Sequence, residues 1–325
     1  MTYLIVTNGD NAARRIEKLK IADTVLSWRD VLHDGPVPLC ESLQEQSRGR
    51  AMFIAGFAGL TEGEVLADFK QRDDILLNAP CDARIELWFE HDLYDQLQVM
   101  QIIHVLSHQC PDRDIYLVQS HDYLSEMTQV NFEILGTQAV HLTDTQCEYA
   151  SRAWQAFCAK TPFEMMTFLM QTPTLPFIHR ALERLLREYN DVETGLPLSL
   201  FNALSLLEKD KEAPLKALFR YMQDCEEAKF MGDLSFAHLI GPLLKGDNAL
   251  LKGVDKSLIS MSQNEYQAFF DQRVTLTPLG EDVLQAKQRY KFPADMNKWI
   301  GGVLCNSYHF DSKTNEMTEK DTVLS

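Results

Sequence analysis

Paired cysteines, positive charge and long apolar runs are what this chain of 325 residues has little of. Its seven cysteines are scattered and never spaced as C-x-x-C, so they give no zinc or disulfide framework and fit a reduced, cytoplasmic compartment. The net charge of −16 argues against broad contact with nucleic acid or an anionic membrane. The longest nearly apolar run, residues 51–60, is too short to span a bilayer, and no basic region precedes the N-terminal apolar run. We therefore expect neither a membrane span nor a signal peptide.

Standard nucleotide-binding loops are also missing at the turn where one would be expected. Asn8-Gly9-Asp10 places a glycine between a predicted strand and a predicted helix, where the backbone can approach a ligand closely. The turn has neither the G-x-G-x-x-G nor the G-x-x-x-x-G-K-[ST] pattern. Dinucleotide and P-loop sites are therefore not predicted.

The first half of the chain alternates short apolar strands with helices. This alternation predicts an α/β fold with a doubly wound, mainly parallel sheet. Thr61 and Glu64 form the pattern of a capping box at a helix start. The predicted strands cover residues 3–6, 23–28, 85–89, 114–118 and 139–142, and the predicted helices cover 12–19, 43–56, 62–76, 93–106 and 145–159.

A different pattern begins after a proline-interrupted stretch at residues 161–176. Residues 195–310 are mostly helical, with helices predicted at 198–207, 214–224 and 233–244 and short strands at 249–252 and 273–277. Three helices with a two-stranded wing are typical of a winged-helix-like domain. The predicted organisation is a site-bearing domain at 1–160, a helical connector at 161–194, the winged-helix-like domain at 195–310 and a flexible tail at 311–325.

Polar groups follow four predicted strands, and the carboxyl ends of parallel strands lie at one edge, where α/β proteins bind ligands. Converging carboxylates and imidazoles act as general acids and bases or hold a divalent cation, and the sequence leaves both open. Three of these polar groups supply the predicted site residues, and the remaining one, Gln119 to Asp122, follows the strand at 114–118. The predicted catalytic residues are Glu90, His91, Asp92 and Asp95, and the predicted ligand-binding residues are Asn8, Gly9, Asp10, Arg29, Asp30 and His33.

Structural roles are the alternative explanation for some of these residues. Asp10 and Asp92 lie at helix starts, where a carboxylate meets exposed N–H groups and the positive end of the helix dipole. Arg29 and Asp30 can pair with each other instead of binding a ligand. His91 lies between two acids, whose charge raises its pKa, whereas burial would lower it. We expect His91 to line a polar cleft with a carboxylate within hydrogen-bond reach.

These residues predict an enzyme, a hydrolase or transferase that acts on a small polar, nucleotide-like ligand at the carboxyl edge of the sheet. His91 would be the acid or base, the acids would orient it or hold a cation, and Arg29 would meet a substrate anion. The alternative is a ligand-sensing regulator or protein-interaction module that uses the winged-helix-like domain. The predicted recognition helix has no Lys or Arg, and residues 195–285 carry 9 basic and 13 acidic residues, so nucleic acid is not an expected partner.

Several motifs resemble a bacterial family known as domain of unknown function 1835, over most of the chain. Relatives often have a serine where this chain has Asn11, and a Trp-rich end where this chain has Ser307 to Phe310. The resemblance implies this two-part organisation and no particular activity. It rests on Asn8 to Asp10, Trp28 to Val37, Trp88 to Gln98, Phe230 to Phe236, Leu276 to Gly280 and Trp299 to Val303.

Overall fold

The computed structural model describes residues 2–111, 113–254, 266–293 and 296–319 and divides the chain into two compact units. The first unit comprises residues 1–183 and the short segment 301–303, and the second comprises residues 184–300 and 304–325. The sequence predicted a first domain that ends at residue 160 and a connector up to residue 194. In the structure, the chain up to residue 183 belongs to the first unit.

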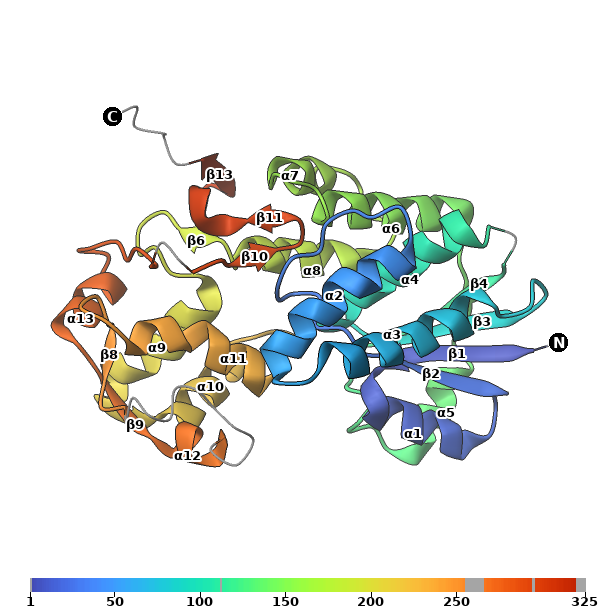
Figure 1. The fold of residues 1–325 in the computed structure, drawn as a ribbon, viewed down its shortest axis with the longest axis horizontal. Helices are drawn as coiled ribbons and strands as arrows, with labels where there is room; N and C mark the ends of the chain where they lie inside the picture. Colours follow the sequence, from blue (N-terminus) through green and yellow to red (C-terminus); the bar gives the residue numbers. More distant parts are fainter. Residues whose placement is uncertain (1, 112, 255–265, 294–295, 320–325) are drawn as a thin grey trace. The chain divides into compact units, whose positions relative to one another are not determined.

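The first unit alternates strands and helices along the chain, as the ribbon shows (Figure 1). Its last helix, α8, continues three residues past the boundary. The elements are β1 (Tyr3–Asn8), α1 (Gly9–Leu19), β2 (Thr24–Trp28), α2 (Leu43–Ala58), α3 (Glu62–Leu77), β3 (Arg84–Glu90), α4 (Leu93–Gln109), β4 (Ile115–Ser120), α5 (Gln129–Gly136), β5 (Val140–His141), α6 (Asp144–Phe157), α7 (Phe163–Leu169) and α8 (Pro176–Leu186).

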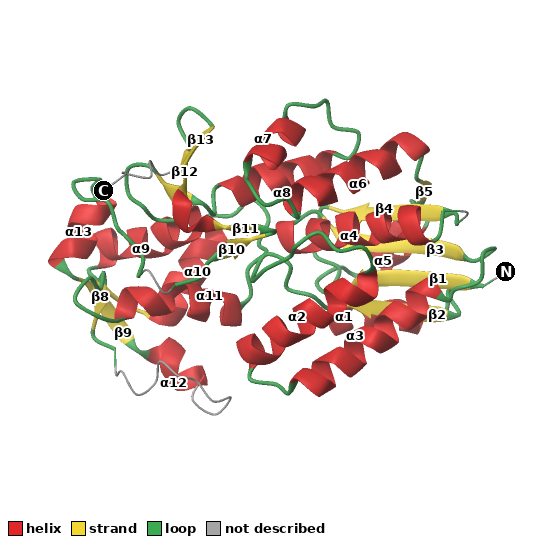
Figure 2. Ribbon diagram, turned by 45° about the horizontal axis from the view of Figure 1, so that its top comes forward, coloured by secondary structure: helices red, strands yellow, loops and turns green. Residues whose placement is uncertain are grey.

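The strands form one five-stranded sheet in the order β2-β1-β3-β4-β5, drawn in yellow in Figure 2. Strands β1 to β4 are parallel, and the short edge strand β5 is antiparallel to β4. The predicted mainly parallel α/β sheet is therefore confirmed. Because β1 to β4 run in the same direction, their carboxyl ends lie at one edge of the sheet.

Helices cover both faces of this sheet. On one face α1 and α5 pack over a cluster that includes Ile5, Ile16, Trp88 and Phe132. The sequence analysis predicted no helix between the strands at 114–118 and 139–142, where α5 lies, because this helix has only eight residues. Thr128 caps this helix by accepting a hydrogen bond from Asn131 N, and burial of Phe132 on the sheet stabilises it.

Helix α4 lies on the other face and is the most buried helix of the site region. The ring of Trp28 donates to Gln101 of α4 over 2.8 Å, and α4 in turn packs against α6. The helix predicted at 93–106 is therefore present. Its glutamines Gln96, Gln98 and Gln101 are fully buried, where Gln101 donates to Gln46 of α2 and Gln98 donates to the carbonyl oxygen of Asp30 after β2.

The capping box at the start of α3 is confirmed, since Thr61 and Glu64 exchange both hydrogen bonds. Two glycines in the first unit have positive φ with consequences for the fold. Gly9 has a φ of 48°, which lets β1 turn directly into α1. Gly301 has a φ of 57°, and a Cβ there would lie 1.9 Å from the carbonyl oxygen of Phe157. The segment 301–303 therefore packs on the first unit only because a side chain is absent.

The second unit contains short helices and two three-stranded sheets, and β10 pairs with β11 in a further sheet of two short strands. One sheet has the antiparallel order β7-β9-β8, and in the other β12 pairs with β13 and with β6. The elements from residue 190 onward, of which β11 begins in the segment 301–303, are β6 (Asn190–Asp191), α9 (Leu198–Asp210), β7 (Glu212–Pro214), α10 (Leu215–Asp224), α11 (Asp233–Ile240), a 3-10 turn (Gly241–Leu244), β8 (Leu251–Lys252), α12 (Tyr266–Asp271), β9 (Arg273–Leu276), α13 (Pro278–Leu284), β10 (Trp299–Ile300), β11 (Val303–Leu304), a 3-10 turn (Cys305–Ser307), β12 (Tyr308–Asp311) and β13 (Glu316–Glu319).

The C-terminal region differs from the sequence prediction. The sequence assigned residues 311–325 to a flexible tail, but residues 316–319 form β13, which pairs antiparallel with β12. The periodic signal is weak because β13 is short and mostly exposed. Residues 320–325 of the predicted tail lie outside the described residues. No helix in the described parts of the chain has the length and apolar character needed to cross a membrane.

Candidate functional site

The site is built around the junction of β3 and α4, at the carboxyl edge of the sheet. β3 ends at Glu90, and Asp92 is the N-cap of α4, with its carboxylate accepting a hydrogen bond from Asp95 N over 3.1 Å. The capping role that the sequence raised for Asp92 is therefore confirmed. Capping fixes the position of the Asp92 carboxylate at the strand end, but it does not account for the two acids beside it.

Asp95 is held by two donors from different strand ends. The side-chain amide of Asn8, at the end of β1, donates to Asp95 Oδ1 over 2.7 Å. The backbone N–H of Glu90 donates to Asp95 Oδ2. One carboxylate thus joins the ends of β1 and β3, and the predicted convergence of Asn8 with the β3 acids is present.

Glu90 connects the same point to the next strand. Its Oε1 accepts a hydrogen bond from Leu124 N over 2.7 Å, in the loop that follows β4. Its carbonyl oxygen accepts from the side chain of Gln96 over 2.6 Å. Gln96 also receives a hydrogen bond from Gln119 at the end of β4, over 3.4 Å. Three strand ends therefore share one polar network.

Glu90, Asp92 and Asp95 form what we call the carboxylate cluster. One oxygen from each lies within 4.8 Å of the others, and the residues are 6%, 4% and 0% exposed. Among the described residues, the carboxylate cluster is the one place where three potential metal-ligating side chains lie this close together. His91 is not one of the three.

The carboxylate cluster differs from the other buried acids. Asp30, Asp73, Glu86 and Glu188 are also buried, and each forms an ion pair with an arginine at 2.7 to 2.9 Å. Within the described residues, no Lys or Arg forms an ion pair with any acid of the cluster. Burying a charge without a partner is strongly unfavourable, so the cluster needs protons or a bound cation to balance it.

The pKa values of the cluster express this imbalance. Burial raises the pKa of the Asp92 carboxyl to about 7, and the charge of Glu90 adds to the rise. Burial also raises the pKa of Glu90 and holds the pKa of Asp95 well above its usual range, with repulsion from Asp92 as the next cause for Asp95. Near neutral pH the cluster therefore retains protons unless a cation replaces them.

His91 points its ring into an aromatic group beside the cluster. The ring centroids of His121, Tyr123 and Phe177 lie 5.4, 6.2 and 5.9 Å from that of His91, and His121 packs edge-on against Phe177 at 4.7 Å. His91 is half-buried and His121 is exposed. Two imidazoles and two aromatic rings therefore lie together beside the carboxylate cluster, at the loops that follow β3 and β4.

Asp10 and Arg29 form a separate, exposed pair. Arg29 lies 3.3 Å from Asp10 and 2.6 Å from Asp68 of α3. Asp10 is in the first turn of α1, whose N-cap is Asn8, so Asp10 does not cap by a side-chain hydrogen bond. No atom lies within 4 Å of the position that a Cβ of Gly9 would take, so glycine serves here through the positive φ of the turn and not through a close contact.

Asp30 and His33 are buried in the interior of the first unit. The sequence predicted instead that both would contact a ligand. Arg50 of α2 binds both oxygens of Asp30, at 2.7 to 3.2 Å, and also donates to the carbonyls of Val31 and Asp34. Arg29 and Asp30 therefore do not pair with each other. His33 is buried, and its Nε2 lies 3.5 Å from Oδ2 of Asp34. Both oxygens of Asp30 are committed to Arg50, so it holds the loop after β2 in place.

Sequence reasoning did not identify Arg50, Gln96, Tyr123 or Phe177. Gln96 follows Asp95 directly and could have been included as part of the same helix turn. Arg50 and Phe177 come from distant segments, and nothing in the sequence around them indicates a contact with the strand ends.

The chain matches no protein-family model, and a search of curated proteins finds no significant match. The resemblance to the domain of unknown function 1835 family remains a prediction.

Proposed function

We propose that the first unit is an enzyme domain, a hydrolase or transferase, that acts on a small polar ligand at the carboxyl edge of its sheet. The observation that carries the proposal is the carboxylate cluster. Three buried acids without a basic partner cost folding free energy, and strongly raised pKa values of this kind are typical of functional sites. Every other buried acid among the described residues has an arginine beside it, so the chain can neutralise such groups where structure alone requires it.

A divalent cation is the group that we assign to this cluster. Carboxylate oxygens are ligands for hard cations such as Mg²⁺, which is commonly held by one or two carboxylates and keeps several waters. Both oxygens of Asp95 already accept hydrogen bonds. We therefore assign direct contact with the cation to Glu90 and Asp92, and we assign to Asp95 and Asn8 the role of holding the strand ends in position.

The chemistry follows from the groups beside the cation. A cation held there would lower the pKa of a bound water or substrate hydroxyl, and a nearby base would take its proton. As that oxygen forms a bond to the substrate, the bond to the leaving group would break, and the leaving group would depart with its electron pair and take up a proton. We propose His91 for this role because it follows Glu90 directly and is half-buried at the same edge. His121 is a second imidazole at the same place. Arg29, the contact that the sequence predicted for a substrate anion, is paired with Asp10 and Asp68, so we do not assign it that role.

Cation binding by the chelator-treated full chain tests this proposal. Isothermal titration with Mg²⁺ and Mn²⁺ should show one site, and Asp92→Asn should lose it, because the variant keeps a capping oxygen but removes the charge. The matched control is Asp122→Asn, an exposed acid in the loop after β4, which should bind as the parent does. Absence of binding in the parent protein, or equal binding by Asp92→Asn, contradicts the proposal.

For the second unit we propose a winged-helix-like arrangement. Support comes from the element order α9, β7, α10, α11, β8, β9 and from the strand order β7-β9-β8. The exposed positions of α11 include Asp233 and His238 and no Lys or Arg, which favours contact with protein over contact with DNA. A ligand-sensing regulator is thus the second candidate function. Salt-sensitive gel shifts with genomic fragments would favour DNA binding and contradict the protein-contact assignment.

A further inference from the structure

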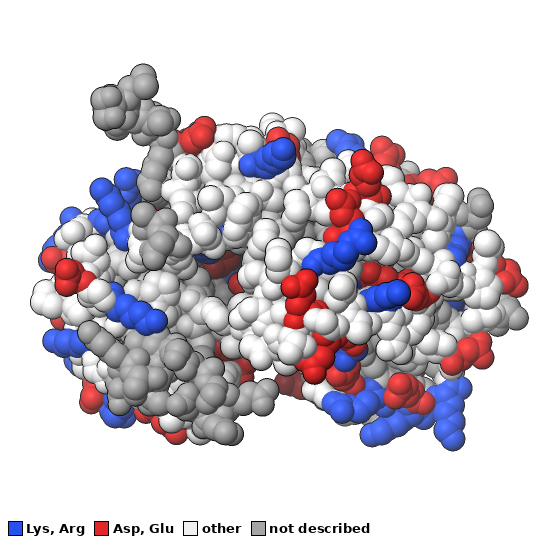
Figure 3. Space-filling view, viewed as in Figure 1, with Lys and Arg blue, Asp and Glu red and all other residues white. Residues whose placement is uncertain are grey.

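Four basic side chains gather along α1, in a chain whose net charge is −16. Arg14, Arg15, Lys18 and Lys20, which we call the α1 basic cluster, line a hollow of about 650 Å³ together with one acid, Glu17. Figure 3 shows basic side chains gathered on the face where Figure 1 places α1. This volume lies within the range of roughly 300–1,000 Å³ that small-molecule sites occupy.

The α1 basic cluster has no acidic partners in the part of the chain that the structure describes. None of its four members forms an ion pair, although the chain has 47 acids, whereas Arg29 nearby contacts two. Compensation of the helix dipole accounts for Lys18, which lies in the last turn of α1. It does not account for Arg14 and Arg15 in the middle of the helix, whose contacts are with neutral groups, so no acid within the described residues neutralises their charge.

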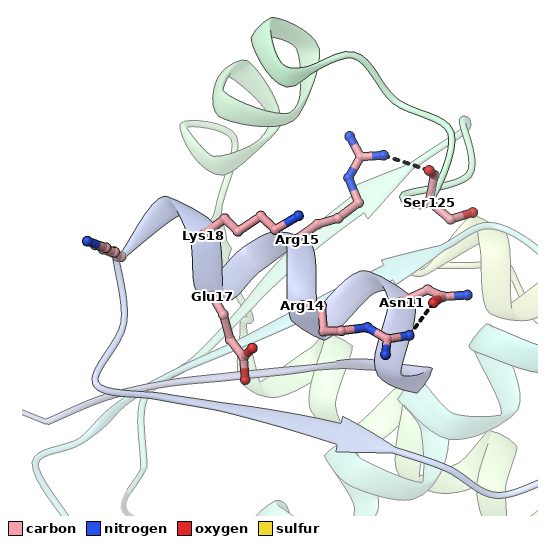
Figure 4. Close-up of a pocket in the computed structure, with 7 residues that line it drawn as sticks. Asn11, Arg14, Arg15, Glu17, Lys18 and Ser125 are labelled. Carbon is pink, nitrogen blue, oxygen red and sulfur yellow. Dashed lines mark hydrogen bonds between the residues drawn. The ribbon is translucent and has the colours of Figure 1, made fainter.

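Two of the basic groups are already fixed in position. Arg15 donates to the carbonyl oxygens of Ser125, over 2.6 Å, and of Met127, both in the loop between β4 and α5. Arg14 donates to the side chain of Asn11, and Figure 4 shows the two arginines extending from α1 in these directions. Fixed groups lose less conformational entropy when a ligand arrives. The hollow is therefore organised for binding before any ligand is present.

We propose that this hollow binds a soluble ligand that carries two or more phosphate groups. Guanidinium groups pair with phosphate oxygens through two parallel hydrogen bonds, and lysines add compact positive charge. Four basic groups against one acid leave a local charge of +3, which suits a diphosphate or triphosphate. A long nucleic acid would need basic groups over a wider surface, which the net charge of −16 disfavours. The assignment does not depend on the carboxylate cluster.

Calorimetric titration of the full chain with inorganic tripolyphosphate, in magnesium-free buffer, tests the proposal. The parent protein should bind one equivalent, and the affinity should fall between about 50 and about 200 mM salt. Arg14→Gln with Lys18→Gln should weaken binding about tenfold for each contact removed. The matched control is Arg48→Gln with Lys70→Gln, which removes two exposed positive charges from α2 and α3 and should leave binding unchanged.

Several outcomes overturn the assignment. These are no saturable binding of tripolyphosphate at low salt, or an equal loss of binding in the two double variants. Binding only to a single-stranded RNA oligonucleotide, or only to phosphatidylglycerol vesicles, would replace the small ligand with a macromolecule or a membrane surface. Circular dichroism of both double variants should show the parent's helical signal, because all four substitutions are at helix surface positions where glutamine is compatible. A loss of that signal in Arg14→Gln with Lys18→Gln would call for testing the two substitutions singly.

Discussion

Asp92→Asn should make the cation-free protein more stable at alkaline pH while it removes the proposed cation site. Asn and Asp are equally good N-caps, so the hydrogen bond from Asp95 N to the side-chain oxygen is retained. The substitution removes the ionisable group whose desolvation is the main cause of the raised pKa. A residue kept for function at the cost of stability should behave in this way.

The magnitude follows from the pKa. The carboxyl of Asp92 is raised from 3.8 to about 7, and 1.36 kcal/mol per pKa unit makes its full ionisation in the native state cost roughly 4 kcal/mol. Between pH 3.8 and about pH 7 the folded state binds more protons at Asp92 than the unfolded state does. The contribution of Asp92 to the free energy of unfolding therefore falls as the pH rises towards 7, and it is fully lost above that pH. We expect roughly 2–3 kcal/mol of that loss between about pH 5 and about pH 8. Loss of the charge–dipole interaction at the cap, about 0.3–1 kcal/mol, is smaller.

Urea denaturation in excess chelator, at both pH values, gives the measurement. We compare the difference in unfolding free energy, Asp92→Asn minus parent, at about pH 5 and about pH 8. This difference should be roughly 2–3 kcal/mol larger at the higher pH. Asp122→Asn is the matched control and should show no such difference, because Asp122 is exposed. A parallel pH dependence in the parent and Asp92→Asn would refute the argument that this acid is buried at a cost.

Three further outcomes test other parts of the account. Arg50→Met should destabilise the protein by about 3–5 kcal/mol in urea denaturation, because it leaves Asp30 buried without its partner, and a loss below about 1 kcal/mol would show that the pair is solvated. Gly301→Ala should lower the melting temperature, since its Cβ would lie 1.9 Å from the Phe157 carbonyl oxygen at a φ of 57°, and an unchanged value would place this segment elsewhere. Mg²⁺ affinity should rise about tenfold per pH unit up to about pH 7 and then level off, as the proton on Asp92 is displaced; a flat profile would exclude Asp92 as a ligand.

The sheet and the position of the site could be predicted from sequence, for identifiable reasons. Strands β1 to β4 are short apolar runs bounded by polar turns, and polar residues after parallel strands meet at one edge. The convergence of Asn8 with Glu90, Asp92 and Asp95 follows from that rule. Burial of the acids without a basic partner could not be predicted, because it depends on which side chains reach the site from other segments.

The surroundings of His91 could not be predicted from its neighbours in sequence. The strand ends at Glu90 and the chain bends at His91 and Asp92, so His91 lies beside the carboxylate cluster with its ring against His121, Tyr123 and Phe177. Phe177 is 86 residues away, and no local pattern indicates this contact. Asp30 is a similar case, because its partner Arg50 lies 20 residues away and no local pattern indicates the pair.

The most direct test of the central claim is anomalous diffraction from crystals of the chain grown with Mn²⁺. The account predicts an anomalous peak at the carboxylate cluster, about 2.0–2.6 Å from oxygens of Glu90 and Asp92. The same crystals of Asp92→Asn should lack the peak, while Asp122→Asn should keep it. A parent structure in which the cluster holds no metal, with Mn²⁺ bound only elsewhere, would contradict the claim that these buried acids exist to bind a cation.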